Sequence, residues 1–305
     1  MKDRIEWSLF FILVTISCVL LLVMIWLNIF YRSAARVYSI SVIIREPSER
    51  FTKGMEQAAL DSNADLQIQS SFEPNNTEQQ IEYLRRELIN YSDAVIISAE
   101  DPKFLKEYLD KERPSVPIVT VMQPLDSASV VCHVGADESE LGRILGEWIT
   151  KSASGQCVVI APKKDVKQMH ITRFEALKQV LDSAGIEFAV RYADTESIAD
   201  ELSGERYDTI AVIDENLLVN TCEQVRSEAD IYGIGYTGGL RPYLESGRIK
   251  GLAVYSEYDA GYLSVQAAVE AAAKKTAAGT ALTIHKVTAK NMYQEPMVNV
   301  LFPIG

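Results

Sequence analysis

Polar and aromatic side chains stand at the ends of several short apolar runs of this 305-residue chain. Arginine, carboxylate and amide groups, such as those of Arg173, Asp214 and Asn216, make paired hydrogen bonds to neighbouring hydroxyl groups. Aromatic rings, such as those of Phe51 and Tyr255, pack against C–H surfaces. These residue types together suit non-covalent binding of a small hydroxylated molecule. The other candidate binding residues at run ends are Arg45, Asp101, Gln123, His170 and Thr237.

Each candidate also has an ordinary structural role that the sequence leaves open. Arg173 could cap or pair on its own helix, and Phe51 could belong to the core. Asp214 or Asn216 stands before a helical segment and could cap it. His170 could be a plain surface histidine. The candidates therefore depend on the elements that must position them.

After residue 37, short runs rich in valine and isoleucine alternate with segments of helical period. Such runs are typical of strands buried on both faces, and their alternation with helices predicts parallel sheets. Ligands bind beyond the carboxyl ends of strands in such sheets, which is where the candidates stand. The expected strands are 38–44, 66–69, 94–98, 118–122, 157–161, 187–192, 209–213, 231–235 and 252–255. The expected helices lie at about 50–62, 76–90, 102–111, 138–151, 171–184, 196–203, 215–227, 239–246 and 259–277.

These repeated strand–helix units exceed what one small sheet holds, so we expect two doubly wound domains of about four to six strands each. Asn76 and Thr77 precede Glu78 and Gln79, which predicts a capped helix start. No low-complexity linker separates the halves, as expected where the chain crosses between domains several times.

Residues 230–239 read DIYGIGYTGG and fit the spacing G-x-G-x-x-G of dinucleotide-binding loops. Glu257 even lies about 20 residues further on, where a ribose-holding acid would be expected. That motif, however, follows a completed strand and opens the first βαβ unit. Here it falls in about the eighth unit. We therefore expect Gly233 and Gly235 within a strand, with residues 237–239 turning toward a ligand.

The sequence carries no catalytic motif of the G-x-S-x-G, H-E-x-x-H or P-loop type, and its three histidines lie far apart. We therefore expect no enzymatic activity, no catalytic residues, no cofactor and no metal site. Cys132, Cys157 and Cys222 form no C-x-x-C pair, so we expect buried, unpaired cysteines. The net charge of −12 would repel phosphate backbones, so we expect no nucleic acid partner.

Residues 9–30 form an uncharged apolar run of 22 residues. A helix of that length spans about 33 Å, enough to cross the core of a bilayer. Trp7, Trp26 and Tyr31 stand near its ends, where amphipathic rings favour the interface. The run predicts one uncleaved transmembrane helix. Two alternatives are a cleaved signal peptide, for which the run is too long, and a lipoprotein signal at Cys18, whose preceding residues fit poorly.

Several segments carry a family resemblance in their order and spacing. They are ISVIIREPSERFTKGMEQAA with Phe51 and Gly54, IEYLRRELINYSDAVIISAEDP, VPIVTV followed by VGADESELG with Asp137 and Gly142, ITRFEALKQVL with Arg173, IYGIGYTGG, SGRIKGLAVYSEYDAGY and VTAKNM. From residue 38 to the C-terminus the chain resembles the type I periplasmic binding proteins. The ribose- and galactose-binding group is the most similar, and its lobes also form the sensor half of lac-repressor-type regulators.

The resemblance implies an α/β fold of two doubly wound parallel-sheet lobes joined by a multi-strand hinge, here preceded by one N-terminal transmembrane helix. Residues 1–36 would be the tail and anchor. Residues 37–139 with 256–285 would form the N-terminal lobe, and residues 140–255 with 286–305 the C-terminal lobe. The arginine of the ITRF segment, Arg173, would contact the ligand between the lobes.

The pocket departs from the pattern of the family's sugar binders at four places. They usually carry Asp-Arg where this chain has Met122-Gln123, and often Asn-Asp where Asp214-Glu215 stand. Thr237 replaces an aspartate, and Tyr255 replaces a glutamine. These departures imply a different, less polar ligand or a pocket that no longer binds.

The function expected from these observations is that of a membrane-anchored, extracytoplasmic solute-binding protein. Its two lobes would close around a small polar, sugar-like ligand and deliver it to an ABC permease. Residues 9–30 would hold the single-pass protein at the cell membrane. The alternative is a ligand-sensing module that contacts the ectodomain of a membrane histidine kinase. A transcription regulator is not expected, because an apolar span occupies the place of a DNA-reading head.

Overall fold

The computed structural model describes residues 13–26, 36–70, 73, 76–90, 92–152, 155–164, 166–225 and 228–303. The chain divides into two units, Met1–Val37 and Tyr38–Gly305. In the first unit, residues 13–26 form a helix. Within the described ranges, no helix combines the length and the apolar character needed to cross a bilayer. Parts of the predicted span 9–30 lie outside the described residues, and the span stays a prediction.

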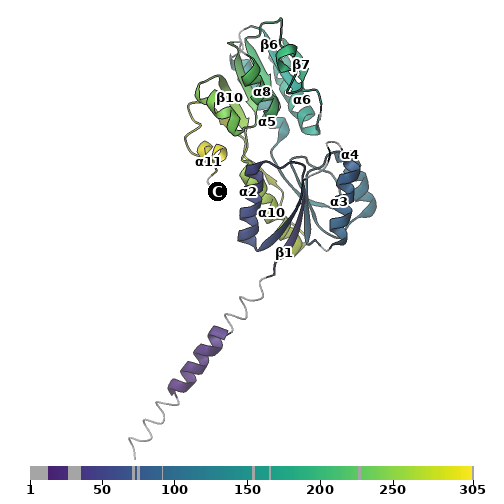
Figure 1. The fold of residues 1–305 in the computed structure, drawn as a ribbon, viewed down its shortest axis with the longest axis vertical. Coiled ribbons are helices and arrows are strands. Elements are labelled where there is room, and N and C mark those ends of the chain that lie inside the picture. The colour runs from purple at the N-terminus through teal and green to yellow at the C-terminus, as the bar shows by residue number, and fades with distance from the viewer. Residues whose placement is uncertain are drawn as a thin grey trace, which may run out of the picture. The chain divides into compact units, whose positions relative to one another are not determined.

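The second unit contains two six-stranded sheets (Figure 1). The first sheet has the order β11-β5-β4-β3-β1-β2 and is parallel throughout. Its strands are β1 (Tyr38–Ile43), β2 (Ala64–Gln69), β3 (Ala94–Ile97), β4 (Ile118–Val121), β5 (Val130–Gly135) and β11 (Thr280–Ala281). Strands β3 and β4 are buried at every residue, as the continuous valine and isoleucine runs predict.

The second sheet has the order β12-β10-β9-β8-β6-β7. Its strands are β6 (Cys157–Pro162), β7 (Phe188–Ala193), β8 (Thr209–Val212), β9 (Asp230–Ile234), β10 (Ile249–Val254) and β12 (His285–Val287). Strand β12 runs antiparallel to β10, and the other pairs are parallel. Gly233 lies within β9, and a Cβ there would come within 2.3 Å of Leu218 Cδ2. The glycine thus serves close packing inside a strand, as expected from its place in the chain. Gly235 was also expected within a strand, but it lies just beyond the end of β9 with a φ of +90°.

Helices cover both faces of each sheet, which gives the predicted α/β architecture of two parallel-sheet lobes (Figure 1). The N-terminal lobe has α2 (Glu49–Ser62) and α10 (Glu257–Lys274) on one face and α3 (Thr77–Ile89) and α4 (Pro102–Glu112) on the other. The C-terminal lobe has α5 (Glu138–Ser152), α6 (Gln168–Ser183), α7 (Ile198–Glu201), α8 (Glu215–Gln224), the 3₁₀ turn η1 (Gly238–Leu240), α9 (Arg241–Glu245) and α11 (Met297–Leu301). As predicted, Asn76 caps α3 by accepting a 3.0 Å hydrogen bond from the amide of Gln79.

The chain passes between the sheets after β5, after β10 and after β11. Three crossings agree with the expected multi-strand hinge. His285, which the predicted bounds give to the N-terminal lobe, pairs with Val254 in the second sheet. At His285 the predicted bound is therefore wrong by one residue, and the other bounds of the two lobes stay a prediction.

The cores and cysteines follow the sequence pattern closely. One cluster of buried apolar side chains runs through α2, α10, α5 and the facing strands of both sheets, and two further clusters lie under α3–α4 and α8–α9. Cys132, Cys157 and Cys222 are buried and unpaired, as predicted. Burial raises the pKa of the Cys157 thiol to about 11 and that of Cys222 to about 12, so both thiols stay protonated at neutral pH.

Candidate ligand-binding cleft

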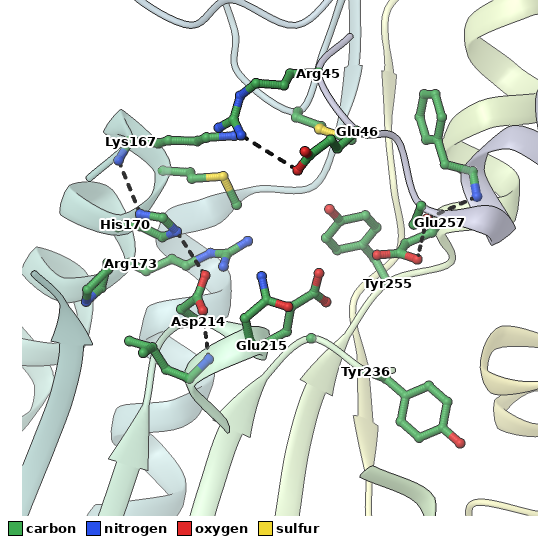
Figure 2. Close-up of a pocket in the computed structure, with 18 of the residues that line it drawn as sticks. Arg45, Glu46, Lys167, His170, Arg173, Asp214, Glu215, Tyr236, Tyr255 and Glu257 are labelled. Carbon is green, nitrogen blue, oxygen red and sulfur yellow. Dashed lines mark hydrogen bonds and ion pairs between the residues drawn. The ribbon is translucent and has the colours of Figure 1, made fainter. Parts of the chain in front are cut away.

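A cavity of about 570 Å³ lies at the carboxyl ends of the strands, with lining residues from both lobes (Figure 2). Arg45 follows β1 in the N-terminal lobe, while Arg173 and Asp214 come from α6 and the start of α8 in the C-terminal lobe. Tyr255 stands on the crossing between β10 and α10. A molecule in this cavity would therefore touch both lobes and the segment that crosses between them at Tyr255.

Arg173 and Glu138 form a buried ion pair on the C-terminal side of the cavity. The Arg173 Nε donates to Glu138 Oε2, and Nη1 donates to the Ile213 carbonyl at 3.1 Å. Their side chains are only 6% and 7% exposed. Burial alone would lower the pKa of Arg173, but the Glu138 carboxylate outweighs it and the pKa lies above its usual value. Arg173 is thus a fixed cation whose guanidinium points toward the cavity (Figure 2).

His170 and Asp214 form a second pair beside Arg173. The backbone N–H of Lys167 donates to His170 Nδ1 at 3.1 Å, so in the neutral ring the proton sits on Nε2. That nitrogen lies 3.3 Å from Asp214 Oδ2 (Figure 2). The other oxygen, Oδ1, caps α8 by accepting from the Leu217 amide at 2.9 Å. Burial opposes the Asp214 charge, but these bonds outweigh it and the pKa lies below its usual value. Asp214 is a helix cap and a cavity residue at once.

The N-terminal wall of the cavity carries Arg45, which is tied back to its own lobe. Its Nε donates to Glu100 Oε2 at 3.1 Å, and Nη1 lies 3.7 Å from Glu46 Oε2. The Glu100 side chain is only 3% exposed, and the Glu100 backbone amide donates a hydrogen bond to Gln80 Oε1 at 3.1 Å. The Arg45 guanidinium therefore enters the cavity with a defined orientation.

Arg50 connects the two lobes beside the crossing between β10 and α10. Its Nη2 lies 2.9 Å from Glu257 Oε2 in the first turn of α10, and Ser48 Oγ donates to the same carboxylate at 2.9 Å. Arg50 also donates to the Tyr236 carbonyl of the C-terminal lobe and lies 5.3 Å from the centre of that ring. The contact fixes the approach of α2 to the end of β9.

Seven of the ten predicted binding residues border this cavity, and three do not. Those that border it are Arg45, Phe51, His170, Arg173, Asp214, Asn216 and Tyr255. Phe51 is only 1% exposed and packs in the core, so it offers little ring surface to a ligand. Gln123 is buried at 3% exposure beside Met122, which lines the cavity in its place. Thr237 precedes η1, and its neighbour Tyr236 lines the cavity instead.

Asp101 lies outside the cavity because it caps α4. Its Oδ1 accepts from the amides of Lys103 at 2.9 Å and Phe104 at 3.1 Å. We predict that Asp101→Ala costs about 1 kcal/mol of stability, the usual loss for an N-cap. Urea unfolding followed by circular dichroism measures this loss. The control Glu107→Ala, on the exposed surface of the same helix, should change stability by less than about 0.5 kcal/mol. Equal stability of both variants would contradict the capping role.

Several residues that line the cavity are not among the ten predicted binding residues. Arg50 and Glu257 line the cavity from the first turns of α2 and α10, and Lys164, Lys167 and Glu215 line it from the C-terminal lobe. From the sequence, Glu215 was noted as a departure from the family pattern, and Glu257 only for its distance from the glycine motif. No group of three or more histidine, cysteine or acidic side chains in the described part of the chain is arranged to hold a metal ion.

Structural comparison finds the same fold in sugar-binding proteins of bacteria. A carbohydrate transporter solute-binding protein from Agrobacterium radiobacter, in complex with D-arabinose, has a TM-score of 0.77 at 19% identity and covers 88% of this chain and 99% of its own. A protein from Agrobacterium vitis with bound D-fucose has a TM-score of 0.77 at 15% identity, with 88% and 100% covered. One from Bacillus halodurans with bound myo-inositol has a TM-score of 0.73 at 18% identity, with 85% and 96% covered.

No curated protein sequence matches the chain significantly. The periplasmic binding protein domain, in contrast, matches residues 40–276, which span both lobes and the crossing at Tyr255. This chain therefore belongs to the periplasmic binding protein family.

Proposed function

We propose that this protein is a membrane-anchored, extracytoplasmic solute-binding protein that closes its lobes around a small sugar-like ligand for import by an ABC permease. The observation that carries the proposal is the cavity at the carboxyl ends of both sheets, lined by Arg45 and Glu257 from one lobe and Arg173 and Asp214 from the other. A ligand held by both sets favours the closed arrangement, because only closure completes its hydrogen bonds. This is binding chemistry, and no enzymatic role is proposed.

The ligand class is supported by the chemistry of the cavity and by the relatives. Guanidinium, carboxylate and amide groups converge there, which suits vicinal hydroxyl groups. Three structures of the same fold contain D-arabinose, D-fucose and myo-inositol. The differences at Met122, Gln123, Thr237 and Tyr255 remain the reason to expect a ligand other than a common pyranose.

The anchor is supported by the uncharged run 9–30, of which residues 13–26 are helical with exposed apolar side chains. The family domain begins at residue 40, shortly after that run. A tether of this kind would hold the binding domain at the membrane, and we propose that the domain lies on the extracytoplasmic side. Protease accessibility of the domain in intact cells, compared with lysed cells, tests this placement.

The test of the function is ligand-dependent stabilisation of the full-length protein in detergent, with D-arabinose, D-fucose, myo-inositol and related polyols as probes. A ligand at about 100 times its Kd adds about 2.7 kcal/mol, which corresponds to a rise in Tm of about 5 °C or more. Asn216→Ala should reduce the shift without altering the ligand-free Tm. The Asn216 side chain is exposed in the cavity, and the hydrogen bond from the Asn220 side chain goes to the backbone carbonyl of Asn216, which the substitution keeps. Absence of any shift across the panel would contradict the proposal.

Co-purification separates transport from sensing. Capture of an ABC permease from cross-linked membranes supports import. Capture of a histidine kinase without a permease would instead support the sensing alternative, in which the closed lobes contact the kinase ectodomain.

A further inference from the structure

Glu215 is the first residue of α8 and projects into the cavity beside Tyr255 (Figure 2). Its side chain lies against Gly235, where an added Cβ would come within 2.7 Å of Glu215 Oε2 and 2.8 Å of Glu215 Cβ. Gly235 also has a φ of +90°, in the left-handed region that favours glycine. The backbone thus makes room for this carboxylate at the carboxyl end of β9.

Other carboxylates already neutralise four of the cations that line the cavity. These ion pairs are Arg45–Glu100 at 3.1 Å, Arg50–Glu257 at 2.9 Å, Lys164–Asp194 at 3.0 Å and the buried pair Arg173–Glu138. Lys167 is a further lining cation, and its backbone N–H donates to His170 Nδ1. Within the described residues, Glu215 has no lysine, arginine or histidine at ion-pair distance.

The charges that face Glu215 do not compensate for the missing partner. Burial first, and then the carboxylates of Glu257 on α10 and Asp214 at the cap of α8, raise its pKa to about 7. The opposing cations, Arg173 on α6 and Arg50 on α2, are bound to Glu138 and Glu257. Glu215 is therefore a carboxyl group in the cavity without a cation paired to it.

We propose that the ligand supplies this cation: it is an amino sugar or a similar hydroxylated amine, whose ammonium group binds Glu215 next to Tyr255. The inference rests on the proposed function and specifies its ligand class. An ammonium group donates charge-assisted hydrogen bonds and supplies the counter-charge that a partly buried carboxylate lacks. Arg45, Arg173 and Asn216 remain available for the hydroxyl groups.

The charge also sets a pH dependence of binding. A bound cation lowers the pKa of Glu215, so binding below pH 7 releases a proton from that carboxyl group. Affinity for the amine should rise as the pH increases from 6 toward 7, by up to about tenfold per unit. Above that range the ammonium group of an amino sugar begins to lose its own proton, and the rise should end. A neutral sugar supplies no counter-charge, and its affinity should not rise in this way.

Matched pairs of probes test the inference by titration calorimetry on the full-length protein in detergent. The pairs are D-glucosamine with D-glucose and D-galactosamine with D-galactose, each with its N-acetylated form as a neutral derivative of the amine. The amine of at least one pair should bind at least tenfold more tightly than its neutral counterparts. Glu215→Gln should abolish that preference and its pH dependence. Glu223→Gln, the same substitution at an exposed position of α8, should retain both.

The outcomes separate this inference from the proposed function. Neutral sugars that bind as tightly as their amines, or a preference that survives Glu215→Gln, would overturn the charged-ligand inference and leave sugar binding standing. If neither these probes nor any member of the polyol panel binds, both the charged-ligand inference and the proposed function are overturned. Thermal unfolding of Glu215→Gln checks that the variant folds. Because glutamine removes an uncompensated charge, its Tm at pH 8 should equal or exceed that of the parent protein.

Discussion

Gly54→Ala is expected to destabilise the protein by about 3 kcal/mol or more, because α2 and α10 cross at this residue without room for a methyl group. A Cβ at Gly54 would lie 2.0 Å from the carbonyl oxygen of Tyr258 and 3.0 Å from the amide of Tyr262, both backbone atoms of α10. From the other helix, a Cβ at Gly261 would lie 2.0 Å from the carbonyl oxygen of Phe51. Backbone cannot rotate away as a side chain can, so the helices must move apart.

The same separation should weaken the site, because both helices carry cavity residues in their first turns. Arg50 on α2 pairs with Glu257 on α10 across this crossing. We therefore expect Gly54→Ala to lose ligand-dependent stabilisation as well as stability. Urea unfolding and thermal shift measure the two effects.

Gly238→Ala is the matched control for Gly54→Ala. Gly238 has no heavy atom within 4 Å of its would-be Cβ, and its φ is not in the left-handed region. The control should change stability by less than about 0.5 kcal/mol. A loss below 1 kcal/mol for Gly54→Ala would show that the two helices are not held at this distance.

The fold could be predicted because its strongest determinants are local. Valine- and isoleucine-rich runs bounded by helical segments gave each expected strand within a few residues of its observed bounds. Strands β5, β11 and β12 were missed. β11 and β12 have two and three residues and exist only through pairing with β5 and β10. Such pairing depends on tertiary structure, so the local sequence of so short a strand does not predict it.

The site could be predicted only as far as strand ends determine it. His170, Arg173, Asp214 and Asn216 follow from their positions after β6 and β8. The strand-end rule does not say which way a loop folds, and Asp101 shows this by turning back to cap its helix. Arg50, Glu257 and the Glu138 partner of Arg173 belong to helix starts, and only the packing of helices against sheets brings them to the cavity.

Arg173→Met is expected to cost about 3–5 kcal/mol of stability, because it leaves the buried Glu138 carboxylate without its counter-charge. Glu138 Oε1 already has no hydrogen-bond partner among the described residues. Loss of the bond from Nη1 to the Ile213 carbonyl removes a further buried contact. Urea unfolding at pH 7 measures the loss.

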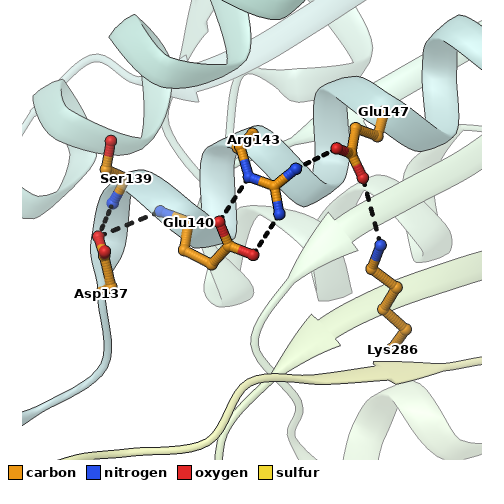
Figure 3. Close-up of polar contacts among 6 residues, drawn as sticks. All are labelled: Asp137, Ser139, Glu140, Arg143, Glu147 and Lys286. Carbon is orange, nitrogen blue, oxygen red and sulfur yellow. Dashed lines mark hydrogen bonds and ion pairs between the residues drawn. The ribbon is translucent and has the colours of Figure 1, made fainter.

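Arg143→Met provides the control, since Arg143 is also an arginine paired with glutamates, but on the exposed surface of α5. It contacts Glu140 and Glu147, and Glu147 in turn lies 3.3 Å from Lys286 Nζ (Figure 3). Exposed pairs contribute about 0–1 kcal/mol, so Arg143→Met should change stability little and leave ligand binding intact. A similar loss in both variants would contradict the importance of burial at Arg173.

The double variant Arg173→Met with Glu138→Met separates the structural role of the pair from its role in binding. Removing both charges restores an apolar contact in a buried place, so its stability should return to within about 2 kcal/mol of the parent. Ligand-dependent stabilisation should still be lost, because no guanidinium then points into the cavity from α6. Restored binding in the double variant would mean that Arg173 holds Glu138 and α5 in place and makes no contact with the ligand.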